Sequence, residues 1–75
     1  MTGYNGWANY ETWNVSSWIQ NDEGLYNLAR QFSSYTDFQT FMTSVYGRLV
    51  QTRDGISYND PDLDVERLNE MFADL

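Results

Sequence analysis

Apolar residues recur through most of the chain at the spacing of an α-helix, in which positions i, i+3, i+4 and i+7 share one face. Three sets follow this rule: Leu25, Leu28, Ala29 and Phe32; Phe38, Phe41, Met42, Val45, Tyr46, Leu49 and Val50; and Val65, Leu68, Met71, Phe72 and Leu75. No repeat, low-complexity tract or linker interrupts them. The pattern predicts an all-α fold, a compact bundle of about four short helices that forms one acidic domain over residues 1–75.

Short polar side chains mark the expected starts of the first two helices. Asn9 is placed to cap a helix that runs to about Gln20, and Asn21 can take the left-handed conformation at its end. Asp22 then serves as the N-cap of a second helix, with Glu23 near the positive end of its dipole. The second helix is therefore expected to follow the first directly.

The third helix has the most regular apolar pattern. Ser33-Ser34-Tyr35 breaks the second helix, and Thr36-Asp37-Phe38-Gln39 matches the T-x-x-Q capping box, so the third helix is expected to start there. Gly47 falls opposite the apolar face, where it costs about 1 kcal/mol relative to Ala. Arg53-Asp54-Gly55 is expected to end the helix.

The segment before the last helix allows two interpretations. Ile56-Ser57-Tyr58 is short and β-prone, so it is expected to be extended. The Asp54-Gly55 pair is a hairpin turn signal, and a small hairpin across it is the competing interpretation. Asn59-Asp60-Pro61 then forms a turn, and the last helix is predicted over residues 62–73.

The first helix departs from the one-sided pattern, because its apolar residues lie nearly all the way round. Glu11 is its only charge, and its other polar residues are small and neutral. A helix that is apolar on all sides needs cover on all sides. It is either the central helix, wrapped by the others, or one side of it meets another chain. The candidate contact residues for that aromatic interface are Trp7, Tyr10, Trp13 and Trp18.

The amino-acid composition excludes most enzyme mechanisms. The 75 residues include no Cys, no His and no Lys, which leaves no thiolate nucleophile, no default general base near neutral pH and no Schiff-base lysine. It also excludes a disulfide framework and the usual kind of structural zinc site. Paired carboxylates can hydrolyse glycosides, but a helical domain of this size offers little room for a cleft. We expect no enzyme and no cofactor.

Charge and hydropathy set the expected surroundings. Eleven Asp and Glu against four Arg give a net charge of −7, which repels nucleic-acid phosphates and anionic lipid surfaces. No apolar run approaches the roughly 18 residues of a membrane span, and the first residues do not resemble a secretory signal. The aromatic residues before position 20 lack the nearby cations of a base-stacking platform. We expect a cytoplasmic protein without direct nucleic-acid or membrane contact.

Negative charge is concentrated in the last third of the chain. Seven of the eleven acids lie at or after Asp54, where Arg67 is the only counter-charge. Four of them share one stripe of the predicted last helix, about 6 Å apart along its axis: Asp62, Glu66, Glu70 and Asp74.

The acidic stripe has two interpretations. It is either a solvated face or a docking surface for a basic partner, and the sharpest form of docking is DNA mimicry, in which carboxylates imitate a phosphate strand. The absence of Lys, which normally intersperses solvated faces, favours docking. The candidate partner-binding residues are Asp60, Asp62, Asp64, Glu66, Glu70 and Asp74.

The alternating acids at 60, 62 and 64 do not predict a calcium loop. Counted from Asp60, an EF-hand needs Gly at its sixth position and Glu at its twelfth. Val65 and Met71 stand there instead, and we expect no metal site.

Several strings resemble a known family. The runs NYETWNV at 9–15, WI at 18–19 and NDEGLY at 21–26 resemble a family of small uncharacterised proteins found largely in bacteriophage genomes, including cyanophages. The runs DPDLD at 60–64 and LNEM at 68–71 are similar to the family's C-terminal part, and the likeness covers about half the chain. The resemblance implies no catalytic residues. It implies the cytoplasm of an infected bacterium, where small phage proteins tend to bind and block host components.

Together these observations predict a small phage-type binding protein that inhibits or redirects a host protein with a basic surface. Charge on the acidic face would steer the encounter and apolar anchors would supply most of the affinity. The alternative is a structural or assembly protein, or a homodimer, that uses the aromatic helix 9–20 as its contact. High salt should weaken the first kind of contact and not the second.

Overall fold

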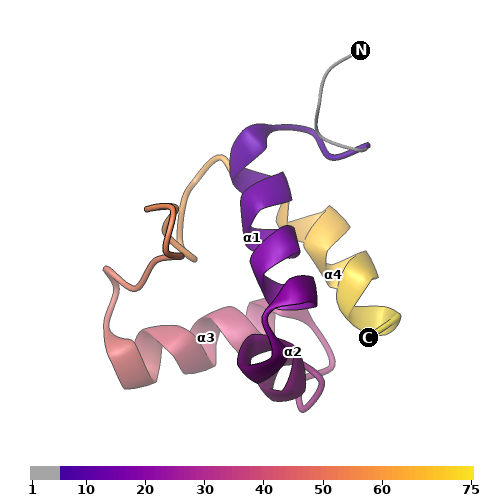
Figure 1. Cartoon of the computed structure of the whole chain (residues 1–75). Helices are drawn as coiled ribbons and strands as arrows, with labels where there is room; N and C mark the ends of the chain where they lie inside the picture. The colour runs from indigo at the N-terminus through magenta and orange to yellow at the C-terminus, as the bar shows by residue number, and fades with distance from the viewer. Residues whose placement is uncertain (1–5) are drawn as a thin grey trace.

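A computed structural model of the chain describes residues 6–75, which form the predicted all-α fold (Figure 1). Its helices are α1 (Tyr10–Asn21), α2 (Glu23–Ala29), α3 (Tyr35–Tyr46) and α4 (Val65–Ala73). In these residues the only β pairing is an isolated antiparallel bridge between Gln51 and Ser57.

The helices are arranged around α1. Figure 1 shows α4 beside α1, the segment between α3 and α4 on the other side of α1, and α2 and α3 towards the C-terminal end of α1. Hydrogen bonds fix both neighbours, because the Asp64 N–H donates to Thr12 Oγ1 from the α4 side and Asn14 contacts Asp54 on the other. Helix α1 is therefore covered on more than one side, although Tyr10 is exposed and Trp13 and Trp18 are only half-buried.

The predicted caps of the first two helices are confirmed. Asn9 accepts a hydrogen bond from the Thr12 N–H at 2.9 Å, and Asp22 accepts one from the Leu25 N–H at 3.0 Å. The left-handed turn expected at Asn21 is wrong, because Asn21 stays helical and the chain turns extended at Asp22, with φ −93° and ψ 119°. The Asp22 backbone still bonds to α1 while its side chain caps α2, so no left-handed residue is needed.

The start of α3 lies before the predicted capping box. Ser34 is the N-cap and accepts from the Asp37 N–H at 3.2 Å. Ser34 therefore caps the helix two residues before Thr36, the predicted cap. Because the helix starts earlier, Tyr35 belongs to it, and the Tyr35 ring is completely buried. Gln39 does not complete a capping box, because its side-chain amide donates to the Tyr58 carbonyl at 2.8 Å.

The predicted extension of α3 to residue 53 is wrong, because Gly47 ends the helix. Gly47 has φ 91° and ψ 168°, a conformation that is essentially restricted to glycine. Three apolar residues close to this helix end are exposed, whereas Val50 is half-buried against the core. Val45 is 54% exposed, Tyr46 62% and Leu49 89%.

Between α3 and α4, the hairpin interpretation describes the chain best. The Thr52 N–H donates to the Ile56 carbonyl at 2.8 Å, the Tyr58 N–H donates to Val50 at 3.2 Å, and Gly55 turns the chain with φ 89°. We call residues 50–58 the hairpin segment.

The start of α4 is three residues later than predicted. The turn at Asp60, whose carbonyl accepts from the Leu63 N–H at 3.1 Å, directs Leu63 into the core before the helix begins. Asp64 then caps α4 by accepting from the Arg67 N–H at 3.1 Å. Asp62 consequently precedes the helix.

Aromatic rings fill the core between α3, α4 and the hairpin segment. Phe38 is fully buried, and four rings surround it with centroids 5.5 to 6.0 Å away: Phe32, Tyr35, Tyr58 and Phe72. Tyr35 Oη donates to the Tyr58 carbonyl at 2.8 Å. Burial raises the pKa of the Tyr35 hydroxyl far above its usual range, and burial with the nearby charge of Asp22 raises the pKa of Tyr58 to about 12. Both hydroxyls stay neutral at physiological pH.

Candidate functional site

The acidic residues of the C-terminal part fall into two groups. Asp60 and Asp64 are half-buried and serve the local backbone, because Asp60 accepts from the Asp62 N–H at 2.8 Å and Asp64 caps α4. Asp62, Glu66, Glu70 and Asp74 are exposed. The acidic face thus consists of two carboxylates that stabilise the fold and four that point to solvent.

The predicted four-residue stripe is shorter than expected. Only Glu66 and Glu70 lie within α4, one turn apart. Asp74 is the C-cap and keeps helical backbone angles, so it continues the row by one position. Asp62 is outside the row because the helix begins after it.

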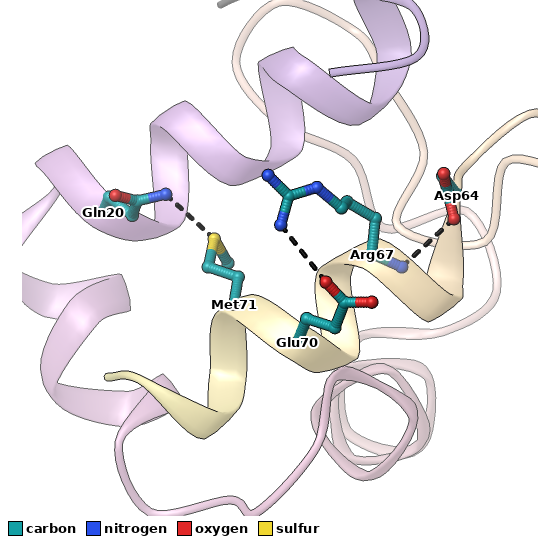
Figure 2. A network of polar contacts seen from close by, with 5 residues as sticks. All are labelled: Gln20, Asp64, Arg67, Glu70 and Met71. Carbon is teal, nitrogen blue, oxygen red and sulfur yellow. Dashed lines mark hydrogen bonds and ion pairs between the residues drawn. The ribbon is translucent and has the colours of Figure 1, made fainter. Parts of the chain in front are cut away.

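Arg67 provides the counter-charge of this face. It lies 3.4 Å from Glu70 Oε1, the one ion pair within residues 6–75, and both side chains are about half exposed or more. Figure 2 shows Arg67 between its partner Glu70 and the cap Asp64, with Gln20 of α1 donating to the sulfur of Met71 nearby. A pair this exposed adds about 0–1 kcal/mol to stability.

The arginines lie mainly over aromatic rings. The guanidinium of Arg67 is 5.0 Å from the Trp7 ring, that of Arg53 is 5.9 Å from Trp18, and that of Arg30 is 5.5 Å from Tyr26. Because these cations contact rings more than carboxylates, most of the negative charge on residues 6–75 has no paired arginine.

The aromatic residues of the predicted interface differ in their exposure. Trp7 is half-buried and packs against the core, and Trp13 and Trp18 are also half-buried. Tyr10 is 38% exposed, with its ring 5.8 Å from that of Trp13. The buried positions of α1 are instead mostly small or polar: Thr12, Asn14, Val15, Ser16 and Ile19.

A polar seam joins α1 to the hairpin segment. It consists of Asn14, Trp18, Thr52 and Asp54. Asn14 Nδ2 and Trp18 Nε1 both donate to Asp54 Oδ2, at 2.7 and 2.9 Å. Thr52 Oγ1 donates to Asn14 Oδ1 at 2.8 Å in a buried position, and itself accepts from the Ile56 N–H.

The seam changes the acidity of its carboxylate. Asp54 is exposed, and the hydrogen bonds from Asn14 and then Trp18 lower the pKa of its carboxyl below the ordinary value, against a smaller opposing effect of burial. The ionised form is favoured because both donors bind it. Asp54 therefore carries a fixed negative charge at neutral pH.

Two hollows share Trp18 and Asp22 in their linings. The smaller, about 290 Å³, is also lined by Trp13 and Asp54. The larger, about 520 Å³, has an apolar lining that includes Leu25, Leu28, Met42 and Val50, with Arg53 at its wall.

Sequence reasoning missed the smaller hollow and the seam. The sequence predicted Asp22 only as a cap and Asp54 only as part of a turn. Asn14 lies 40 positions from Asp54, so no local pattern indicates that they meet. The one available signal was Asn14 itself, a polar residue in a helix otherwise rich in aromatic side chains.

Comparisons with known proteins give a family without an assigned activity. A family model described as "Family of unknown function (DUF7249)" matches residues 1–75, so the chain belongs to that family. Searches of curated proteins and of solved structures return no match. Within residues 6–75, no helix combines the length and apolar character needed to cross a bilayer. No group of three or more His, Cys, Asp or Glu in that part of the chain is placed to hold a metal ion.

Proposed function

We propose that this member of the family is a small, non-catalytic binding protein that inhibits or redirects a host protein in the cytoplasm of an infected bacterium. It would contact a basic surface of that protein through its acidic C-terminal face. The observation that carries the proposal is the charge distribution of residues 6–75. Within this part of the chain a single ion pair is present, three arginines lie over rings, and exposed carboxylates project from α4 and its ends.

Several carboxylates of this face can bind a partner without breaking contacts that stabilise the fold. Asp62 and Glu66 are exposed and their side chains accept no hydrogen bond within residues 6–75, and Asp74 is exposed at the end of α4. Asp60 and Asp64 add charge while they hold the turn and the cap. Such a surface steers a basic partner and repels phosphate, which favours a protein over nucleic acid as the direct partner.

The same arrangement supports competition with a nucleic acid. Glu66, Glu70 and Asp74 follow one another along α4, and a row of carboxylates can occupy cationic positions that otherwise bind phosphates. If the host protein binds nucleic acid, this protein would compete for the same surface. The row is short, so apolar contacts must supply much of the affinity.

Affinity capture from bacterial host lysate tests the proposal. The wild-type chain and the variant Glu66→Lys/Glu70→Lys are used as baits, each at low and high salt. The wild type should retain a basic protein at low salt and lose most of it at high salt, because exposed charges are screened. The reversed variant should lose it at both. Retention of the same protein by the reversed variant contradicts the proposal.

A matched variant distinguishes the effect of charge on the acidic face from the effect of net charge. Glu23→Lys/Asp37→Lys changes the total charge by the same amount at exposed positions in the first turns of α2 and α3. It should still retain the partner. Circular dichroism of each bait confirms that the helices are intact. Equal loss in both variants would indicate a non-specific charge effect and would also contradict the proposal.

A second candidate function, assembly through α1, is favoured by the exposure of Tyr10 and the half-exposed rings of Trp13 and Trp18. An apolar contact of this kind should be insensitive to salt. Light scattering after size exclusion measures it directly. A dimer that persists at high salt and is lost in Tyr10→Ser supports assembly, and a monomer at all concentrations excludes self-assembly.

A further inference from the structure

The smaller hollow, between α1 and the turn at Asp54, has the lining expected of a site for a planar cation. Its volume is about 290 Å³, and two indole rings and two carboxylates line it: Trp13, Trp18, Asp22 and Asp54. We propose that it binds an arginine side chain of the basic partner. This inference rests on the proposed function for the source of the arginine.

Each carboxylate has one oxygen left for a ligand. Asp54 uses Oδ2 for both Asn14 and Trp18, and Asp22 uses Oδ1 to cap α2 through Leu25. Within residues 6–75, the second oxygen of each accepts no hydrogen bond. A guanidinium carries five N–H donors in a planar fork that matches carboxylate oxygens, which an ammonium group does not.

The rings favour the same ligand. Guanidinium groups stack on aromatic faces, and this chain already places Arg67 over Trp7 and Arg53 over Trp18. Arg53 lines the larger hollow and not the smaller one. Among residues 6–75, the lining of the smaller hollow therefore includes carboxylates and rings but no arginine.

The polar seam holds the hollow in shape before a ligand arrives. Asn14 and Trp18 donate to the same oxygen of Asp54, which fixes the carboxylate relative to the indole. A pre-organised site loses less entropy on binding. The larger apolar hollow shares Trp18 and Asp22 with it, so a partner segment with an apolar residue next to its arginine can fill both. This adjacency favours a protein over a free small cation.

The test is a titration of the full chain followed by NMR, with N-acetyl-arginine amide as the probe. The indole N–H signals of Trp13 and Trp18 report the hollow, and that of Trp7 is the internal control. N-acetyl-citrulline amide has the same shape without the charge, and N-acetyl-lysine amide has the charge without the planar fork. The arginine probe should give saturable shifts at Trp13 and Trp18, with affinity roughly tenfold above either control.

Conservative variants locate the binding. Asp22→Asn/Asp54→Asn keeps acceptor oxygens for the cap and the seam and removes both charges, and it should weaken the arginine probe roughly tenfold. Glu11→Gln/Asp37→Asn loses the same charge outside both the hollow and the C-terminal face, and it should change affinity less than about twofold. Equal weakening in the two variants, equal binding of citrulline or lysine amide, or no saturable shift would each overturn the assignment.

The two proposals can fail separately. The titration contains no host protein, so a negative result leaves the capture experiment on Glu66 and Glu70 standing. If Glu66→Lys/Glu70→Lys captures the host protein as well as the wild type does, the C-terminal face is not the docking surface. Saturable binding of the arginine probe at Trp13 and Trp18 would still assign the hollow.

Discussion

The aromatic core and the polar seam both attach the hairpin segment to the helices, but they do so by different physical means. Around Phe38, four rings pack against one another. Their contribution to stability scales with the apolar area that they remove from water. In the seam, Asn14 donates a hydrogen bond to Asp54 and accepts one from Thr52. Each such bond adds little to stability unless its loss leaves a buried polar group unpaired. We therefore expect the core to contribute more to stability than the seam, and the seam to orient the turn as well as adding a smaller contribution.

The largest effect is expected from Phe38→Ala. Phe38 is fully buried among rings, and truncation leaves a cavity that costs about 3–5 kcal/mol. That loss is large for a domain of this size. Urea unfolding measures it, with Tyr46→Ala as the matched control, since this aromatic residue of the same helix is 62% exposed. A change below about 1 kcal/mol in Phe38→Ala would refute the central role of these rings.

A smaller effect is expected from Asn14→Ala. The substitution removes the partner of the buried Thr52 hydroxyl and a donor to Asp54, which costs about 1–3 kcal/mol. Asn27→Ala, at an exposed position of α2, should stay within about 0.5 kcal/mol. Equal free energies of unfolding for the two variants would show that the seam contributes nothing.

The seam should also make stability depend on pH. The folded-state pKa of Asp54 is below its ordinary value, so its contribution is present above the unfolded pKa of about 3.9 and is lost as pH falls through the folded pKa. The difference in melting temperature between wild type and Asp54→Asn should thus be greatest near neutral pH and narrow below about pH 4. A difference that is constant or grows on acidification contradicts this linkage.

The smallest effect is expected at Leu49, which belongs to neither region. It is 89% exposed beyond Gly47, so Leu49→Ser should change the free energy of unfolding by no more than about 0.5 kcal/mol. A loss comparable to that of Phe38→Ala would mean that α3 continues as its apolar spacing suggests.

Local chemistry explains which features were predictable. The caps Asn9 and Asp22 act on backbone groups three residues away, and the apolar spacing of Leu68, Met71 and Phe72 repeats within two turns. Such signals are contained in a short window of sequence. They were sufficient for the all-α fold and for the first two helix starts.

The errors arose where a local signal had competitors. The apolar spacing continues past Gly47 although the helix ends there, and Ser34 caps α3 although the capping-box pattern indicated Thr36. The later start of α4 shortened the acidic stripe by removing Asp62. The hollow was beyond prediction for another reason, because Trp18 and Asp54 meet across 36 positions.

This long separation has a consequence for the order of assembly. The contacts between α1 and α2 are close in sequence, but the seam can form only after a chain of 36 to 40 residues has closed on itself, which carries a loop-closure cost. We expect the turn to dock after the rate-limiting step. In stopped-flow experiments Asn14→Ala should then accelerate unfolding and leave the refolding rate nearly unchanged, and a slowed refolding limb would place docking earlier.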